Sequence, residues 1–406
     1  MGEPQPRRWR EQRWLIDSVI RTEGIDWDQP RSQYLAAPCG PEAAVDFQLI
    51  RQRVQKFADF SSAFELAARR REERATAAEA AGERVTAREN YFVAAIHWGA
   101  AQWPIAENNA RNLRLNERKV DCYSAYARLA DHHVERVLIP FQGRALPAWL
   151  HLPPGYAGGR LPFVVLLPGM DSFKETTVAL YGDRWLQRGL GVLALEMPGQ
   201  YEAAVLGVHA SVENWAAAAP VVMDWLLARP EVDPERVAVA GNSFGSLIGT
   251  IMAGAEPRFR ACAVSAVIHE PGCDTIFNRA SPTYKARFMY MAGYEDEEAF
   301  DRFARSLTWE GWAERVRVPY MALAGEADEL SPLEHTERLC ERLAGPKVLV
   351  VYQDTRHSLA GSPAVALGPS PRALQADWVA ARLAGAPAPS ERWYIDHTGR
   401  LTRTPW

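Results

Sequence analysis

The sequence has few cysteines, and their arrangement argues against a disulfide framework or a zinc site. Five occur among 406 residues, an odd number, and none forms a Cys-x-x-Cys pair. They are widely separated, at Cys39, Cys122, Cys262, Cys273 and Cys340. Disulfide-rich secreted domains and zinc modules instead carry close, regular cysteine spacings. We therefore expect reduced thiols and a cytoplasmic protein.

Long apolar runs and metal-binding spacings are also missing. No stretch of 18 apolar residues occurs, and no amino-terminal apolar segment resembles a secretion signal. The sequence therefore predicts neither secretion nor a membrane span. No His-x-x-x-His or Glu-x-x-His spacing occurs with a supporting carboxylate, so we expect no metal and no cofactor.

The chain carries no excess of positive charge. Lysine and arginine number 46 and aspartate and glutamate 50, which gives a net charge of -4. The run Arg69–Arg74 mixes both signs at helical spacing, a pattern typical of a solvated helix face. We expect a small-molecule substrate rather than a nucleic acid or a membrane as partner. The aromatic content leaves a homodimer open.

Two sequence patterns divide the chain near residue 132. Residues 1–132 are expected to form a helical cap domain, because strand signals are nearly absent there. Residues 133–385 alternate strand-like and helix-like segments and are expected to form the catalytic domain. A Pro-rich linker opens the tail, residues 386–406, which could form a hairpin about Thr398-Gly399.

The pattern of the second section indicates an α/β fold. Eight strands are expected, at 134–140, 145–152, 163–167, 191–195, 237–240, 261–267, 320–324 and 348–352. Helices are expected near 175–188, 213–228, 244–254, 333–343 and 371–384. The first two strands should pair antiparallel across Gln142-Gly143-Arg144. Apolar strands that alternate with helices predict a mostly parallel sheet covered on both faces.

One pentapeptide, Gly241-Asn242-Ser243-Phe244-Gly245, has the form of a nucleophile elbow. An apolar strand precedes it and a helix-forming stretch follows it. A serine on such a sharp turn is held clear of the sheet, and the flanking glycines leave room for the turn. We expect Ser243 to be a nucleophile.

Two later residues complete the pattern of a serine triad in the order Ser, acid, His. Asp328 follows the apolar run 319–324, and His357 follows the apolar run 347–352. Both therefore lie where strands end. Alternatives remain: Asp328 could cap the helix near 332, the rival acids are Glu326 and Glu329, and the nearest rival base, His335, lies in an expected helix.

The oxyanion hole is expected to consist of two backbone N–H groups. In elbow-type serine enzymes one comes from the residue after the nucleophile and the other from the loop after strand three. These positions are Phe244 and Met170, the latter following the Pro168-Gly169 turn. An ordinary strand-to-helix turn would give the same sequence signal.

Six segments together resemble a known family. They are Tyr91-Phe-Val-Ala-Ala-Ile-His-Trp, Val134-Glu-Arg-Val-Leu-Ile-Pro, Leu167-Pro-Gly-Met-Asp-Ser-Phe-Lys-Glu, Glu196-Met-Pro-Gly-Gln, Gly241-Asn-Ser-Phe-Gly and Gly325-Glu-Ala-Asp-Glu-Leu. They resemble the α/β hydrolases grouped with dihydroxypseudooxynicotine hydrolase and the fungal heptaketide pigment hydrolases, over about residues 60–385. The resemblance implies an eight-stranded α/β-hydrolase fold under a helical cap, and a triad at Ser243, Asp328 and His357. It also implies cleavage of a carbon–carbon bond beside a ketone.

The substrate pocket is expected between the cap and the sheet, with a lid insertion at about 269–312. Candidate substrate-binding residues are Asp171, Tyr201, Glu270, Asp274, Tyr91 and Trp98. Tyr201 stands where relatives usually have glycine, and Glu270 or Asp274 could fill the place of a carboxylate that some relatives have after strand six. For the cap aromatics, packing between helices is the favoured interpretation.

Three functions fit these patterns. The first is a serine hydrolase acting on a carbon–carbon bond beside a ketone, or on an ester, in an aromatic or polyketide-like molecule. The second is an acyltransferase or cyclase of secondary metabolism that uses the same serine, and the third is a noncatalytic binding scaffold.

Overall fold

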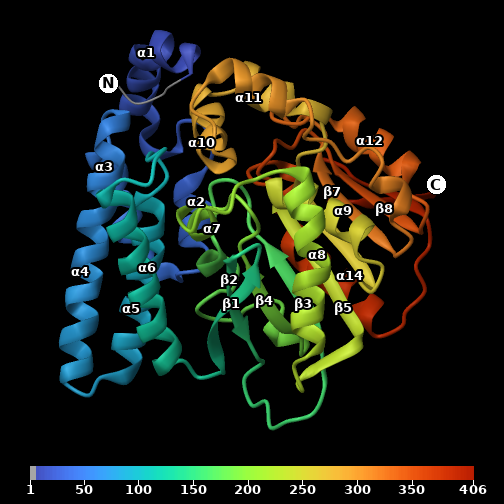
Figure 1. Ribbon diagram of the computed structural model, residues 1–406, viewed down its shortest axis with the longest axis horizontal. Helices are drawn as coiled ribbons and strands as arrows, with labels where there is room; N and C mark the ends of the chain where they lie inside the picture. The colour runs from blue at the N-terminus through green and yellow to red at the C-terminus, as the bar shows by residue number, and fades with distance from the viewer. Residues whose placement is uncertain (1–5) are drawn as a thin grey trace.

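The computed structural model describes residues 6–406, which form a helical bundle beside one large sheet (Figure 1). The bundle consists of α1 (Arg7–Glu23), α2 (Arg31–Ala36), α3 (Ala44–Arg53), α4 (Phe60–Ala80), α5 (Arg84–Ala101) and α6 (Ala110–Leu129). Aromatic rings fill it: the Phe92 ring lies 5.0 Å from that of Tyr126. Tyr123 of α6 packs 4.7 Å from Trp149 of the sheet, so the bundle and the sheet share a core. The predicted helical amino-terminal section is confirmed.

The sheet contains ten strands in the order β1-β2-β4-β3-β5-β6-β7-β8-β9-β10. Their bounds are β1 (Val134–Phe141), β2 (Arg144–His151), β3 (Leu161–Leu167), β4 (Gly191–Leu195), β5 (Val232–Ser243), β6 (Ala261–Val267), β7 (Tyr320–Gly325), β8 (Lys347–Tyr352), β9 (Glu391–Ile395) and β10 (Leu401–Pro405). Neighbours from β4 to β9 run parallel, whereas β1-β2, β2-β4 and β9-β10 are antiparallel. The predicted α/β class is confirmed. The expected strand number was too low, because the tail forms a β9-β10 hairpin and β9 extends the sheet beside β8.

Helices cover both faces of this sheet (Figure 1). They are α7 (Tyr201–Val205), α8 (Val212–Leu227), α9 (Phe244–Ala255), α10 (Pro282–Ala292), α11 (Glu297–Ala304), α12 (Leu333–Arg342), α13 (Pro363–Leu367) and α14 (Pro371–Leu383). The side chain of Val264 faces Gly249 of α9, whereas that of the next residue, Ser265, reaches Gln375 of α14. Successive side chains of a strand point to opposite faces, so α9 and α14 lie on opposite sides of the sheet.

The prediction of a helix over residues 175–188 is wrong. Only two single turns of 3-10 helix form there, at Lys174–Thr176 and Leu186–Arg188. The Asp183 carboxylate accepts the backbone N–H groups of Ala179, Trp185 and Leu186. A side chain thus satisfies backbone donors that a helix would have paired, and this competes with helix formation.

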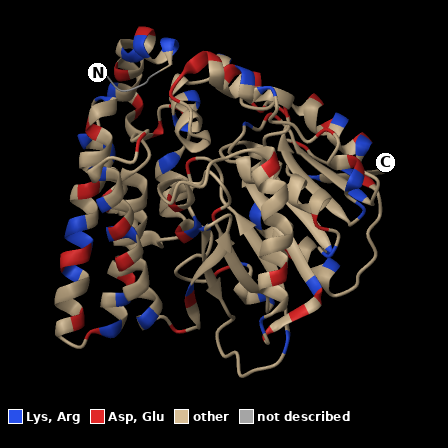
Figure 2. Ribbon diagram, in the orientation of Figure 1, with Lys and Arg blue, Asp and Glu red and all other residues tan. Residues whose placement is uncertain are grey.

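Charged residues of both signs are mixed along the outer helices and are sparse on the sheet (Figure 2). This distribution fits the interpretation of the Arg69–Arg74 run as a solvated face. Between β6 and β7 the chain forms a π-helical turn (Thr275–Arg279) and the helices α10 and α11, which lie beside the amino-terminal helices. Among residues 6–406, none of the helices combines the length and the apolar character that a membrane crossing requires.

Candidate active site

The turn between β5 and α9 holds Ser243 in a backbone conformation that residues other than glycine rarely adopt. Its φ is 55° and its ψ is -123°, an arrangement that costs on the order of 1–3 kcal/mol. A Cβ at Gly241 would lie 1.9 Å from the carbonyl oxygen of Gly245. A Cβ at Gly245 would lie 2.4 Å from the carbonyl oxygen of Leu167. Only glycine fits at either position, and close packing on both sides keeps the strained turn in place.

Ser243, His357 and Asp328 form a continuous chain of hydrogen bonds. The Ser243 Oγ lies 3.0 Å from Nε2 of His357. Nδ1 of His357 lies 2.9 Å from Oδ2 and 3.2 Å from Oδ1 of Asp328. Oδ1 also accepts the backbone N–H groups of Leu330 and Ser331, at 2.9 and 3.0 Å, which fixes the carboxylate. A carboxylate beside Nδ1 favours the tautomer that carries its proton on Nδ1 and leaves Nε2 free. This geometry lets Nε2 of His357 accept the Ser243 proton.

The loop after β7, which carries Asp328, contacts the loop after β8, which carries His357. A Cβ at Gly325, the last residue of β7, would lie 2.1 Å from the carbonyl oxygen of Thr355. The Ala327 N–H donates to the same oxygen at 3.0 Å. The loop after β7 therefore lies directly on the loop after β8, which places Asp328 beside His357.

The rival residues have other partners. The Glu329 carboxylate accepts the backbone N–H of His357 at 3.0 Å, and Glu326 accepts that of Asp354 at 3.1 Å. Both glutamates therefore support the loop after β8 rather than the imidazole. His335 lies on α12, where its Nε2 is 3.9 Å from a carboxylate oxygen of Glu270.

Opposing influences act on the protonation of His357. Burial disfavours the charged imidazolium, but the negative charge of Asp328 and its hydrogen bond to Nδ1 favour it, with smaller contributions from Glu329 and Asp171. The carboxylates prevail, so the pKa of His357 lies above the ordinary value of 6.5. A raised pKa strengthens the imidazole as a base.

The loop after β3 packs directly against Ser243. A Cβ at Gly169 would lie 2.9 Å from the Cβ of Ser243. The next residue, Met170, lines the cavity at the serine, and Phe244 begins α9. N–H groups at the start of a helix have no acceptor within the helix. The expected oxyanion donors, Met170 and Phe244, thus lie on the two segments that flank Ser243.

Side chains fix the course of this loop. The Gln200 amide donates to the carbonyl oxygen of Pro168 and accepts the Met197 N–H at 2.9 Å. The Gly169 N–H donates to the Ser172 hydroxyl at 2.8 Å. Since these bonds lie immediately before and after Met170, they restrict the direction of its N–H group.

Ser243 and His357 open into a cavity of about 720 Å³. This is the size range of small-molecule sites. Its walls include the loops after β3, β5 and β8, the start of α14, and Ile276 and Tyr284 from the region between β6 and β7. One wall comes from the segment around α2, with Gln29, Pro30, Gln33, Tyr34, Ala37 and Pro38. No sequence pattern predicts this wall, since residues 24–43 carry no motif or strong periodicity.

Of the six candidate substrate-binding residues, Asp171 alone lines the cavity. Its carboxylate accepts a hydrogen bond from the Tyr34 hydroxyl and lies 3.6 Å from the Arg31 guanidinium. Arg31 is buried between the rings of Trp27 and Trp103, at 4.5 and 4.8 Å from their centroids. The amino-terminal segment therefore holds Asp171 in place at the cavity wall.

The other five candidates do not line the cavity. Tyr91 and Trp98 of α5 bond to glutamates of α4, as the favoured packing interpretation predicts. Glu270 accepts the N–H and hydroxyl of Thr275 and so caps the π-helical turn. Asp274 bonds to Asn278 and Arg279 of that turn.

Tyr201 lies behind the cavity wall. Its hydroxyl donates to the backbone carbonyl of Asp171 at 3.3 Å, and its ring packs against Phe173 and under the Arg287 guanidinium. Its φ of 21° lies at the border of the left-handed region, which fits the glycine that the family resemblance has at this position. Tyr201 supports the loop after β3 instead of contacting the cavity.

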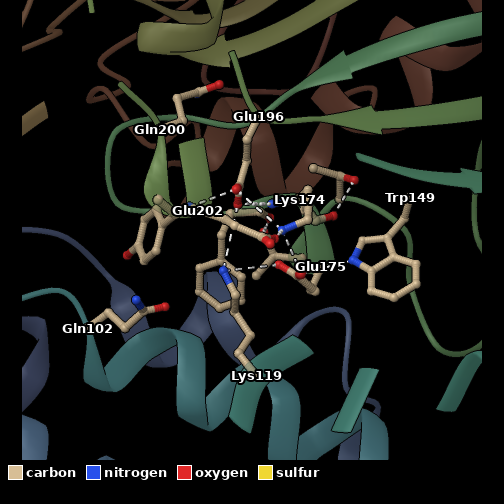
Figure 3. A network of polar contacts seen from close by, with 12 residues as sticks. Gln102, Lys119, Trp149, Lys174, Glu175, Glu196, Gln200 and Glu202 are labelled. Atoms are coloured by element: carbon tan, nitrogen blue, oxygen red, sulfur yellow. Dashed lines mark hydrogen bonds and ion pairs between the residues drawn. The ribbon is translucent and has the colours of Figure 1, made fainter. Parts of the chain in front are cut away.

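Five buried charges form a network beyond this loop (Figure 3). The Lys174 Nζ lies 2.9 Å from Glu175, 3.3 Å from Glu196 and 2.6 Å from Glu202. Lys119 of α6 lies farther away, 3.7 Å from Glu175 and 3.9 Å from Glu196. The side chains of these residues are fully buried or nearly so. We call Lys119, Lys174, Glu175, Glu196 and Glu202 the buried charge network; it joins the bundle to the loops after β3 and β4.

Charge compensation within the network decides its protonation. Burial opposes ionisation of Glu202, but Lys174 and Lys119 outweigh it and lower its pKa to about 2. Burial raises the pKa of Glu196 in spite of the lysines. The pKa of Lys174 is raised, because the three carboxylates outweigh its burial. Lys174 thus stays charged and holds the loop after β3 at its far end.

Comparisons with known proteins agree with this geometry. A family model described as FrsA-like, "Esterase FrsA-like", matches residues 62–358. The "Alpha/beta hydrolase xenA" of Xenoacremonium sinensis is 33% identical over 210 residues, which cover 50% of this chain and 49% of that protein. The chain thus matches about half of the length of this fungal relative. The "2,6-dihydropseudooxynicotine hydrolase" of Paenarthrobacter nicotinovorans is 26% identical over 274 residues, 66% of this chain and 70% of that protein.

A solved structure extends the likeness to nearly the whole fold. The crystal structure of the 2,6-dihydroxy-pseudo-oxynicotine hydrolase aligns with a TM-score of 0.69 over 93% of this chain and 97% of that chain, at 23% identity. The bundle and the sheet therefore share their arrangement with that enzyme. Among residues 6–406, no three His, Cys, Asp or Glu side chains are grouped to hold a metal ion.

Proposed function

Because the chain belongs to the FrsA-like esterase family of α/β hydrolases, we propose that it is a serine hydrolase of aromatic or polyketide-like small molecules. It cleaves a carbon–carbon bond beside a ketone, or an ester, through a covalent acyl-enzyme. The hydrogen-bonded chain from Ser243 through His357 to Asp328, which opens into a cavity of about 720 Å³, is the observation that supports this function.

Acylation begins when His357 takes the Ser243 proton and Oγ attacks the carbonyl carbon of the substrate. The carbonyl oxygen becomes an oxyanion and accepts the N–H groups of Met170 and Phe244. Asp328 stabilises the imidazolium that forms. When the intermediate collapses, the bond to the leaving group breaks and the imidazolium protonates that group, which is an alkoxide from an ester or an enolate-like carbanion from a ketone.

Deacylation repeats these steps with water. His357 takes a proton from water, the resulting hydroxide attacks the acyl carbon, and Ser243 leaves with the proton returned by the imidazolium. A carbanion leaving group needs a proton donor, and the side chains of Glu270, Asp274 and Tyr201 are of types that can supply a proton. None of the three lines the cavity, so His357 supplies this proton in the proposed mechanism.

The proposal is tested with a panel of aryl esters, aryl ketones and β-diketones, together with fluorophosphonate labelling. We expect Ser243 to be labelled, and turnover of at least one class to vanish in Ser243→Ala. Absence of both labelling and turnover would indicate a noncatalytic scaffold. Mass spectrometry of products formed in ¹⁸O water separates the hydrolase from an acyltransferase or cyclase, because only hydrolysis places the label in the acid product.

A further inference from the structure

The rim of the cavity carries two positive charges that lack partners in the protein. Arg184 lies in the connection between β3 and β4, and Arg372 lies in the first turn of α14; both line the cavity and both are exposed. Within residues 6–406, neither guanidinium forms an ion pair or a side-chain hydrogen bond. Arginine side chains at a binding cavity are suited to carboxylates, since their planar N–H groups match the two oxygens.

The two arginines come from segments that contact each other at the rim. The Arg372 side chain is exposed, but protein atoms around the rim partly desolvate its guanidinium and lower its pKa, and the positive charge of Arg184 lowers it further. Contacts between the turn at Leu186–Arg188 and α14 keep their segments together, with an ion pair of 2.6 Å between Arg188 and Asp377. Two like charges held together at a cavity rim create a local positive potential that an anion would relieve.

The carboxylates of the cavity walls cannot serve as this anion. Asp183 is buried and accepts three backbone N–H groups. Asp171 is held by Tyr34 and Arg31. Each acid thus has its own partners, and the rim stays positive although the whole chain has a net charge of -4.

We propose that Arg184 and Arg372 bind a carboxylate of the substrate at the cavity rim while the carbonyl that reacts lies at Ser243. The substrate is then an acyl compound with a free carboxylate at a distance set by the length of the cavity. This inference rests on the proposed function, because it names the class of molecule that the same serine attacks.

A series of 4-nitrophenyl esters tests the inference. The acyl parts are dicarboxylic acids of increasing length, from succinate to suberate, and each half-ester is paired with its neutral methyl ester. The measured quantity is the ratio of kcat/KM for the acid to kcat/KM for its methyl ester. We expect the ratio to reach about tenfold or more at one chain length, because hydrogen bonds between charged groups are the strong ones.

Variants then assign the preference to the two arginines. Arg184→Gln and Arg372→Gln should each lower the ratio, and the double variant should bring it to about one. Arg382→Gln is the matched control, because Arg382 lies in the last turn of α14, donates to the carbonyl oxygen of Pro387 and does not line the cavity. Its ratio should stay at the wild-type value. The wild-type ratio should also fall with ionic strength, since the rim is exposed.

The outcomes separate this inference from the proposed function. If neutral esters are hydrolysed in a Ser243-dependent way but no chain length favours the acid, the serine hydrolase stands and the carboxylate site is wrong. A preference that survives in the double variant also overturns the site. If Ser243 is neither labelled nor needed for any turnover, both proposals fall together.

Discussion

The triad and the buried charge network both contact the loop after β3, and they are built in opposite ways. In the triad, Asp328 accepts bonds from His357 Nδ1 and from two nearby backbone N–H groups, and Ser243 faces the cavity. In the network, Lys174 lies within 3.3 Å of three carboxylates and the whole group is closed to solvent. One site leaves a reactive group without a partner on the cavity side, whereas in the other each carboxylate lies beside a cation, and Arg136 adds an ion pair to Glu202.

This difference shows how the fold divides stability from reactivity. Buried ion pairs are costly to break but contribute little net stability compared with apolar packing. The network therefore serves best as a rigid support, here for the loop that carries Met170. The triad instead depends on the hydroxyl of Ser243, which faces the cavity and has no partner on that side. Substitutions in the two sites should consequently change different quantities.

Ser243→Ala should have the largest effect, a loss of about 10⁶-fold in kcat, by comparison with other serine enzymes. The free energy of unfolding should not decrease, since Ser243 is half-buried in a strained conformation that its hydroxyl does not stabilise. Steady-state kinetics and urea unfolding measure the two quantities. Residual activity within tenfold of wild type would show that another group is the nucleophile.

Asp328→Asn should follow, with a loss of about 10⁴-fold in kcat, because an amide on Nδ1 favours the wrong tautomer. The control is Glu329→Gln, which removes charge next to the triad but leaves the hydrogen bond between Asp328 and Nδ1. If the Glu329 variant loses more activity than the Asp328 variant, then Glu329, and not Asp328, is the carboxylate that assists His357.

Lys174→Met should act mainly on stability. It leaves buried carboxylates without their cation, and breaking a buried pair costs about 3–5 kcal/mol. Lys119→Met should cost less, because its ammonium lies 3.7 Å or more from the nearest carboxylates. Arg338→Met, which breaks an exposed pair with Glu310, should cost less than about 1 kcal/mol. Urea unfolding measures the free energy of unfolding of each variant. Equal decreases in all three would contradict the contrast between buried and exposed charges.

The triad could be predicted from the sequence because each member follows a recognisable strand. The elbow at 241–245 is a local constraint, and a strand end fixes where the next side chain appears. Parallel strands then bring the ends of β5, β7 and β8 to one edge of the sheet, so local motifs sufficed to predict that Ser243, Asp328 and His357 meet.

The cavity walls could not be predicted in the same way. Tyr34 lies 137 residues before its partner Asp171, and nothing local marks either residue as a contact. The buried charge network gave no signal for the same reason, since Lys119 and Glu196 come from different sections of the chain. At 175–188 a pattern suited to a helix was overridden by Asp183, whose side chain pairs backbone N–H groups. Long-range contacts decided the first two cases, and a local bond between a side chain and the backbone decided the third.

The pH dependence of kcat/KM offers a smaller, graded effect. His357 works as a base only when neutral, and its pKa lies above 6.5. We therefore expect kcat/KM to fall about tenfold per pH unit below an inflection that lies above pH 6.5. In Asp328→Asn the carboxylate no longer raises the pKa while burial still lowers it, so the inflection of the residual activity should move to lower pH. An unchanged inflection would mean that another group titrates.

Asp274→Asn should have the smallest effect. Its side chain is 49% exposed, pairs with Arg279 and does not line the cavity. Surface substitutions of this kind change stability by less than about 0.5 kcal/mol, and kcat and KM should stay within about twofold of wild type. Asp171→Asn, at the cavity wall, should raise KM more, because it weakens the contacts to Tyr34 and Arg31 that hold the wall. A large loss of kcat in Asp274→Asn would mean that the region between β6 and β7 moves over the cavity during turnover, and that its carboxylate then reaches the substrate as the sequence had suggested.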